Sequence, residues 1–295
     1  MATERGLVLA SYRRHFAVEL DTGEVLECVL RGRSLTLACG DRVHVQRVAG
    51  GGAIEQVEPR TTLFFRSDAF REKLIAANVS QIIGVVAPDL TLDEELLTRW
   101  SVAAESQHCR FVIAANKRDK AGFDRLRERV ALFASLGYAV VELSAVEDVQ
   151  PLVPYVTGQE SVLIGQSGMG KSTILNAIVP EAQARTAEVS EALETGRHTT
   201  THATLYTLPD DPGWIVDSPG MKAFGLAHLE PAVIEHAFPE FRPFVGECRF
   251  RDCRHDREPG CALRQAVARG EAAAHRLALM RTLIAESRAA RSPLR

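Results

Sequence analysis

The chain has 295 residues, of which 46% are hydrophobic and 25% charged, with a net charge of −3, a composition able to bury the cores of about two domains or of three small ones. No apolar run approaches the roughly 20 residues that cross a bilayer, and residues 1–16 lack the apolar block of a signal peptide. We therefore expect a cytoplasmic protein without a membrane association, whose cysteines stay reduced.

Five short β-rich segments occupy about the first 60 residues. An Asp-Thr-Gly sequence at 21–23 is a hairpin turn signal between the second and third segments. Five short strands in this length predict a small β-barrel of the OB-fold type over residues 1–62. Acidic and basic residues balance here, so charge does not indicate nucleic-acid binding by the barrel. The predicted strands are 7–12, 16–20, 25–30, 42–48 and 53–57.

Buried strands alternate with helices from about residue 80. Continuous apolar runs predict strands that are covered on both faces, and the two segments ending near 107 and 136 have helical patterns. Alternation of this kind predicts an α/β domain with a mostly parallel sheet, assigned to residues 63–225. The sheet is extended by 203–207, as an antiparallel edge, and by 214–216. Residues 226–295 indicate a mostly helical domain around a cysteine cluster. The predicted parallel strands are 81–87, 111–115, 138–143 and 161–164.

A phosphate-binding loop follows the strand at 161–164. The sequence G-Q-S-G-M-G-K-S at 165–172 fits G-x-x-x-x-G-K-[ST] between a strand and a helix. Backbone N–H groups and the helix N-terminus can bind phosphate oxygens, Lys171 can neutralise the β- and γ-phosphates, and Ser172 can ligate Mg²⁺. The loop indicates a nucleoside triphosphate without specifying its base. The candidate binding residues are Gly165, Gln166, Ser167, Gly168, Met169, Gly170, Lys171, Ser172 and Thr173.

A guanine-recognition motif follows the strand at 111–115. The sequence Asn116-Lys117-Arg118-Asp119 matches N-K-x-D. A carboxylate such as Asp119 can accept hydrogen bonds from N1–H and N2–H of guanine, whereas adenine would leave it buried and unpaired. Asn116 can fix the loop, and the stem of Lys117 can cover the base. Asp119 therefore favours GTP over ATP and disfavours a P-loop kinase or ATPase.

The order of these motifs along the chain is unusual. Ser144 and Ala145, at the end of the next predicted strand, are placed to donate backbone N–H groups to guanine O6. Both base-recognition segments precede the phosphate loop, whereas GTPases ordinarily begin with that loop. Because domain termini often lie close together, a fold can survive such a rearrangement. The domain is therefore predicted to be circularly permuted.

Two switch segments are expected after the phosphate loop. Asp217-Ser218-Pro219-Gly220 matches D-x-x-G, so Asp217 should hold Mg²⁺ through water and the Gly220 N–H should contact the γ-phosphate. The next residue, Met221, cannot orient water as a glutamine can. The other switch is expected at 196–201, which reads G-R-H-T-T-T. There Thr200 or Thr201 should complete the Mg²⁺ shell, and His198 is the candidate to orient or activate water.

A cysteine cluster marks the C-terminal region. Cys248, Cys253, His255 and Cys261 give the spacing C-x₄-C-x-H-x₅-C, a Cys₃His set typical of a closed structural Zn²⁺ site. Residues 248–295 contain eleven Arg and five acidic residues, so this basic region is a candidate for binding RNA phosphates. The remaining cysteines lie in apolar strand contexts and are expected in the core: Cys28, Cys39 and Cys109.

Together these motifs resemble those of the RsgA (YjeQ) family of circularly permuted GTPases, over nearly the whole chain. The resemblance implies an OB-fold, a permuted GTPase domain and a C-terminal zinc domain. It also implies a monomer that binds GTP and GDP, assists late maturation of the small (30S) ribosomal subunit through contacts with its rRNA, and hydrolyses GTP faster on the subunit. His198 matches the family residue assigned to catalysis, and Met221 agrees with the family's hydrophobic replacement of glutamine.

One alternative stays open from the sequence. The protein could be a zinc-dependent rRNA-binding module whose nucleotide domain is a tether without turnover. That reading predicts a ribosome affinity that is the same with GDP and with a non-hydrolysable GTP analogue.

Overall fold

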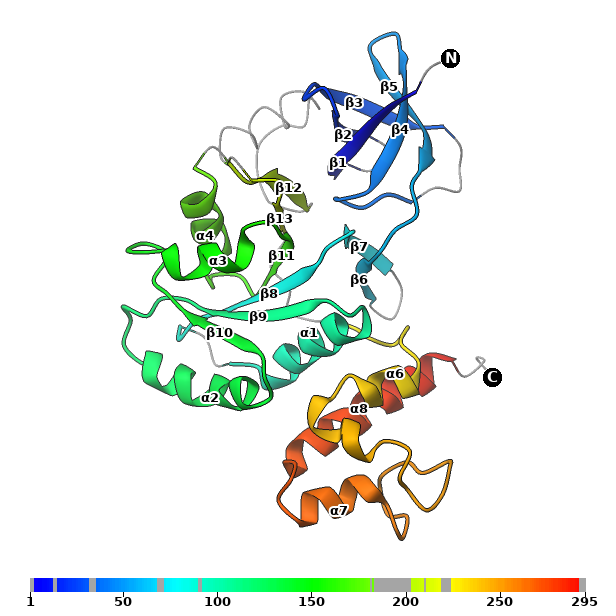
Figure 1. Ribbon diagram of the computed structural model, residues 1–295, viewed down its shortest axis with the longest axis vertical. Helices are drawn as coiled ribbons and strands as arrows, with labels where there is room; N and C mark the ends of the chain where they lie inside the picture. Colours follow the sequence, from blue (N-terminus) through cyan, green and yellow to red (C-terminus); the bar gives the residue numbers. More distant parts are fainter. Residues whose placement is uncertain are drawn as a thin grey trace.

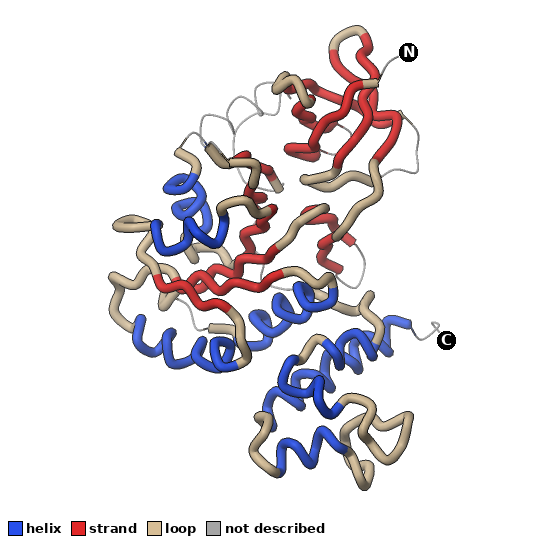
Figure 2. Tube along the Cα trace, in the orientation of Figure 1, coloured by secondary structure: helices blue, strands red, loops and turns tan. Residues whose placement is uncertain are grey.

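The computed structural model describes residues 3–12, 15–31, 36–67, 72–89, 92–180, 182, 203–209, 211–218 and 224–291. Three regions follow one another in space as they do in the chain (Figure 1): a β-barrel, an α/β region, and a C-terminal region of helices and loops. Figure 2 shows strands in the first two regions. The described part of the third region contains helices and loops but no strand. Within the described residues, no helix is both long enough and apolar enough to cross a membrane.

The N-terminal barrel has the five strands expected from the sequence. Its strands follow the order β1-β2-β3-β5-β4, and pairing of β1 with β4 closes the sheet on itself. Inward-facing residues such as Val8, Phe16 and Ile54 are almost completely buried, because alternate residues of a strand face the same side. The strands are β1 (Glu4–Tyr12), β2 (His15–Leu20), β3 (Val25–Leu30), β4 (Arg42–Val48) and β5 (Gly51–Val57).

Five parallel strands form the centre of the α/β region, in the order β10-β9-β8-β11-β13. Every residue of β8 is buried, since helices cover both faces of the sheet. Figure 1 shows α1 and α2 on one face and α3 and α4 on the other. The strands are β8 (Gln81–Val86), β9 (Arg110–Ala115), β10 (Ala139–Glu142), β11 (Glu160–Ile164) and β13 (Trp214–Asp217). The helices are α1 (Glu94–Ser106), α2 (Phe123–Ser135), η1 (Gln150–Leu152), α3 (Val153–Val156) and α4 (Lys171–Ile178).

One strand of the α/β region does not lie where the sequence suggests. β12 (Thr204–Thr207) pairs antiparallel with β13 as expected, but it is not an edge, because Ala10 of β1 pairs with Thr204. The barrel and the α/β sheet therefore form one eleven-stranded sheet. Antiparallel strands β6 (Leu63–Ser67) and β7 (Glu72–Ala77) form an additional hairpin that the apolar pattern did not reveal.

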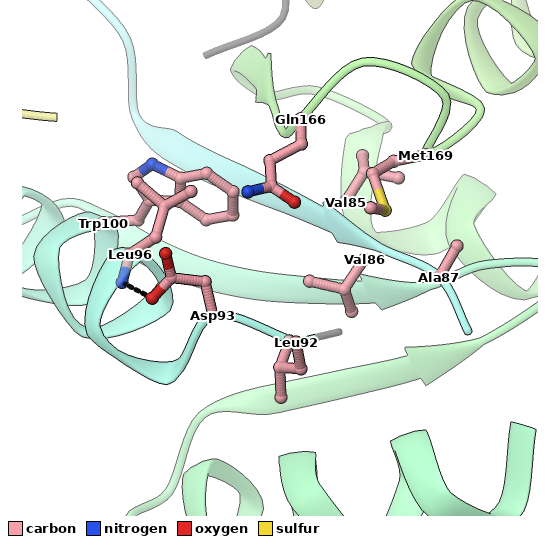
Figure 3. A pocket seen from close by; sticks show the side chains of 9 residues that line it. All are labelled: Val85, Val86, Ala87, Leu92, Asp93, Leu96, Trp100, Gln166 and Met169. Atoms are coloured by element: carbon pink, nitrogen blue, oxygen red, sulfur yellow. Dashed lines mark hydrogen bonds between the residues drawn. The ribbon is translucent and has the colours of Figure 1, made fainter. Parts of the chain in front are cut away.

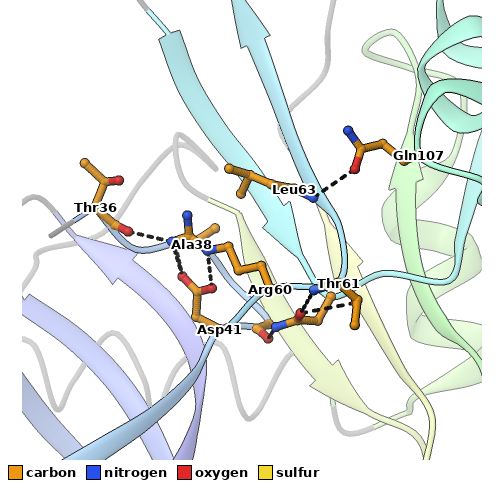
Figure 4. A network of polar contacts seen from close by, with 9 residues as sticks. Thr36, Ala38, Asp41, Arg60, Thr61, Leu63 and Gln107 are labelled. Atoms are coloured by element: carbon orange, nitrogen blue, oxygen red, sulfur yellow. Dashed lines mark hydrogen bonds and ion pairs between the residues drawn. The ribbon is translucent and has the colours of Figure 1, made fainter. Parts of the chain in front are cut away.

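Polar contacts fix the junction between the barrel and this hairpin (Figure 4). The Asp41 side chain is fully buried and accepts two hydrogen bonds from Arg60, at 2.7 and 2.8 Å. Asn78 donates to the carbonyl oxygen of Gly40 at 2.9 Å and accepts from the Thr61 amide at 2.9 Å. Because these side chains form hydrogen bonds across the junction, they define how the two regions meet.

The C-terminal region contacts α1 through a buried arginine. Arg276 is 1% exposed, and it donates to Glu240 at 2.7 Å and to the Thr98 hydroxyl of α1 at 2.6 Å. Arg99 of α1 also forms an ion pair with Glu286. The elements are α6 (Pro231–His236), η2 (Pro239–Phe244), α7 (Ala262–Ala268) and α8 (Ala274–Arg291).

Candidate nucleotide site and metal centre

The phosphate loop connects β11 to α4, which begins at Lys171. Lys171 is 7% exposed, and its Nζ donates to the carbonyl oxygens of Gly165 at 2.9 Å and Gln166 at 3.2 Å. Gly168 and Gly170 have φ angles of +85° and +92°, which residues other than glycine rarely adopt. Burial lowers the pKa of Lys171. A phosphate at the loop would add negative charge beside this buried ammonium.

The guanine loop and the phosphate loop are in direct contact. Asn116 is 2% exposed; its Nδ2 donates to the carbonyl oxygen of Met169 at 2.9 Å and its Oδ1 accepts from the Ala145 amide at 3.0 Å. One side chain thus joins all three predicted nucleotide segments. The approach is so close that a Cβ on Gly170 would lie 2.3 Å from Asn116 Nδ2.

Lys117 makes a second link between the same loops. Its φ is +64°, and its Nζ donates to the carbonyl oxygen of Gly168 at 2.8 Å and to Asp89 at 2.5 Å. The aliphatic stem therefore extends from the guanine loop to the phosphate loop. Sequence reasoning missed Asp89, although it lies just beyond the end of β8, where parallel strands commonly place functional side chains.

Asp119 is held as a carboxylate facing the end of β10. The Ser144 hydroxyl donates to its Oδ1 at 2.7 Å, and Lys120 lies 3.2 Å from Oδ2. The pKa of Asp119 is lowered, chiefly by the Ser144 hydrogen bond. The amide of Arg118 donates to the carbonyl oxygen of Leu143 at 3.0 Å. The carboxylate can therefore accept the two donors that guanine presents.

Asp217 ends β13 with a buried oxygen that lacks a partner. The residue is 7% exposed, and its Oδ1 has no hydrogen-bond partner among the described residues. Burial raises its pKa to about 6, and the charge of Lys171 opposes that shift. An unpaired buried carboxylate oxygen fits a hydrated divalent cation. Ser172, the other described Mg²⁺ candidate, is exposed in the first turn of α4.

Several residues of the two predicted switch segments lie outside the described residues. They are His198, Thr200, Thr201, Gly220 and Met221. Their roles stay predictions from the sequence.

A small pocket lies beside the phosphate loop, between the end of β8 and α1 (Figure 3). Gln166 and Met169 reach it from the loop, and Leu96 and Trp100 reach it from α1. It does not include Asp119, Lys171 or Asp217, and it shares only Gln166 and Met169 with the predicted nucleotide-binding residues.

The four predicted metal ligands converge in the C-terminal region. Their donor atoms lie within 4.8 Å of one another, with His255 Nδ1 3.6 Å from Cys248 Sγ and 3.4 Å from Cys261 Sγ. Cys253, His255 and Cys261 are buried. Ligands at about 2.3 Å from a tetrahedral ion are about 3.8 Å apart, so the donor set fits a metal ion.

A fifth side chain approaches this centre. Glu235 of α6 places its Oε1 3.3 Å from Nε2 of His255, on the other edge of the ring from the cysteines. Sequence reasoning missed Glu235 because it is 20 positions from His255 and belongs to no spacing motif.

Comparisons with known proteins agree with this arrangement. The model of the RsgA GTPase family matches residues 57–227. A small ribosomal subunit biogenesis GTPase RsgA from Nitrosomonas europaea is 50% identical over 284 residues, covering 95% of this chain and 90% of the relative. One from Nitrosospira multiformis is 47% identical over 291 residues, covering 98% of this chain and 93% of the relative.

Two solved structures have the same fold. YjeQ from Thermotoga maritima is 31% identical, with a TM-score of 0.73 and coverage of 97% of this chain and 98% of that one. YloQ, described as a circularly permuted GTPase, matches with a TM-score of 0.70 over 99% of this chain and 97% of that one, and its 24% identity speaks for the fold alone.

Proposed function

Because this chain belongs to the RsgA GTPase family and is a GTPase, we propose that it acts on the small ribosomal subunit, binding it late in maturation and hydrolysing GTP to GDP and phosphate there. The observation that carries the nucleotide assignment is the Asn116 side chain, which bonds at once to the phosphate loop and to the Ala145 amide. The names of the relatives supply the ribosomal subunit.

The nucleotide residues have separate roles in this proposal. Asp119 selects guanine. The Ala145 amide turns from Asn116 Oδ1 to O6 when guanine binds, and Lys171 moves from the loop carbonyls to the β- and γ-phosphates. Asp217 and Ser172, with Thr200 or Thr201, would hold Mg²⁺, which supplies charge neutralisation at the phosphates. The buried Oδ1 of Asp217, which has no hydrogen-bond partner among the described residues, supports its part in that set.

Hydrolysis is proposed to depend on the subunit. Met221 occupies the position from which a glutamine orients the attacking water, and a thioether cannot do so. His198 is proposed to take this role. Slow turnover of the free protein and faster turnover on the subunit follow from this arrangement.

The segment that carries the four metal ligands, residues 248–261, is called the metal loop. It is proposed to bind one structural Zn²⁺ and to contact rRNA. Arg249, Arg251 and Arg254 have no carboxylate ion-pair partner in the described chain, and Phe250 is 41% exposed beside them. The barrel differs, because its described arginines are mostly neutralised by carboxylates: Arg5, Arg31, Arg47 and Arg60. Charge therefore favours the metal loop over the described barrel surface as an RNA contact.

The remaining parts of the proposal concern organisation. The division into domains at 1–62, 63–225 and 226–295, a monomeric state and action in the cytoplasm are all part of it.

Steady-state GTP hydrolysis with and without purified small subunits tests the proposal. We expect low turnover alone and clear stimulation by subunits, with Lys171→Ala abolishing both because the charge at the phosphates is lost. The same subunit affinity with GDP and with a non-hydrolysable GTP analogue, together with no stimulation, would favour the RNA-binding tether instead.

His198→Ala separates catalysis from binding. It should reduce subunit-stimulated turnover far more than it reduces GTP affinity. Parallel losses of both would argue against a role in orienting water.

A further inference from the structure

The imidazole of His255 lies between the metal donors and α6. Its Nδ1 faces Cys248 and Cys261, at 3.6 and 3.4 Å, and its Nε2 lies 3.3 Å from Glu235 Oε1. The side chains of His255 and Glu235 are 6% and 18% exposed. The two ring nitrogens therefore face two different groups, one on the metal loop and one on a helix.

The chemistry of this pair follows from that geometry. An imidazole that ligates a metal is neutral, so the nitrogen that does not ligate carries the hydrogen. A carboxylate that accepts this N–H fixes the tautomer and the ring orientation and increases the basicity of the ligating nitrogen. With limited access of water, the hydrogen bond is stronger than it would be at the surface.

We propose that Glu235 is a positioning residue of the metal centre: it accepts the Nε2–H of His255, presents Nδ1 to the ion, and connects α6 to the bound metal. The inference rests on the proposed metal site and adds to it a residue outside the Cys₃His set.

The chain that enters α6 is anchored at several points. Arg99 of α1 donates to the carbonyl oxygen of Phe224 at 3.5 Å, and Arg291 of α8 donates to that of His228 at 2.8 Å. The Ser287 hydroxyl donates to the carbonyl oxygen of Leu229 at 2.5 Å. Residues 224–236 are thus attached to α1 and α8 at one end and to the metal centre at the other. Metal binding should therefore protect α6 as well as the metal loop.

Competition for Zn²⁺ against a chromogenic chelator tests the proposal on the full-length protein. We expect Glu235→Ala to weaken Zn²⁺ binding by about 10- to 100-fold. Glu235→Gln should lose less, because its amide oxygen can still accept the Nε2–H. Glu271→Ala is the matched control, since it removes an exposed carboxylate of the same region that pairs with Arg269; it should leave the affinity unchanged.

A second background distinguishes positioning from a general loss of structure. His255→Cys would leave a four-thiolate site without an imidazole, so adding Glu235→Ala there should cost no affinity. Equal losses in the two backgrounds, or wild-type affinity in Glu235→Ala, would overturn the inference. A wild-type protein that binds no Zn²⁺ would overturn the metal site itself, which separates the two failures.

Hydrogen exchange supplies a readout independent of affinity. Removal of Zn²⁺ should increase exchange in 231–236 in the wild type, and Glu235→Ala should show faster exchange there even when loaded with Zn²⁺. Exchange in α6 that is unaffected by both changes would contradict the connection.

Discussion

Replacing Asn116 with alanine tests whether one side chain assembles the nucleotide site. The structure gives it two bonds, to the carbonyl oxygen of Met169 at 2.9 Å and from the amide of Ala145 at 3.0 Å. Both partner residues are buried, at 4% and 9% exposure. Alanine would leave a backbone acceptor and a backbone donor without this partner.

The expected cost follows from these two groups. An unsatisfied buried polar group costs about 1–3 kcal/mol, and the lower half of that range suits loops at a ligand cleft, so the total is about 2–4 kcal/mol. At about 1.4 kcal/mol per factor of ten, this equals about 30- to 700-fold in an equilibrium constant. Because both bonds exist without nucleotide, the loss divides between the stability of the free protein and its affinity for GDP.

Two measurements together give the total free-energy cost of the substitution. Titration with a fluorescent GDP analogue gives the change in affinity, and urea denaturation of the nucleotide-free protein gives the change in the free energy of unfolding. Asn116→Asp should be at least as damaging for GDP binding, because an oxygen would then face the Met169 carbonyl. Asn176→Ala in α4 is the control, since its side chain has no hydrogen-bond partner in the described chain. If Asn116→Ala bound GDP like the wild type and unfolded at the same urea concentration, the reasoning would be refuted.

Three further predictions concern Asp119, Asp217 and Arg276. Asp119→Asn should shift preference from GTP toward XTP, because an amide can donate to the xanthine O2; an unchanged ratio in competition against labelled GDP would contradict this. Asp217→Asn should stabilise the nucleotide-free protein at pH 7.5 by up to about 3 kcal/mol, since burial raises the pKa of Asp217 from 3.8 to about 6. The wild type regains that stability as pH falls from about 6 to about 4, so urea denaturation should show the difference vanish there, and a constant difference would be evidence against it. Arg276→Met should lower the free energy of unfolding by about 3–5 kcal/mol because it leaves Glu240 buried and unpaired; adding Glu240→Gln should recover much of the loss, and no recovery would count against an electrostatic cause.

The arrangement also explains how a rearranged chain keeps one nucleotide site. The loops that carry Asn116, Ala145 and Gly165 all leave the carboxyl ends of parallel strands, so they meet at one edge of the sheet whatever their order in the chain. Permutation changes the connections between elements and leaves the strand positions intact.

Local sequence patterns were sufficient to predict much of this protein. The phosphate loop, the N-K-x-D motif and the Cys₃His spacing each lie within a short stretch, and their chemistry follows from residue types at fixed intervals. Short β-rich segments likewise predicted the five barrel strands, and continuous apolar runs predicted the parallel strands, because a strand covered on both faces is apolar throughout. Motif order alone indicated the circular permutation.

Other features depended on contacts between residues far apart in the chain. The pairing of Ala10 with Thr204 turned a predicted edge strand into an interior one. The buried Arg276–Glu240 pair and the contact of Glu235 with His255 likewise have no signature in the sequence. A rule based on composition or spacing depends on residues that are near one another in the chain. Which distant groups meet depends on strand register and on the packing between separate elements, and only the tertiary structure determines register and packing.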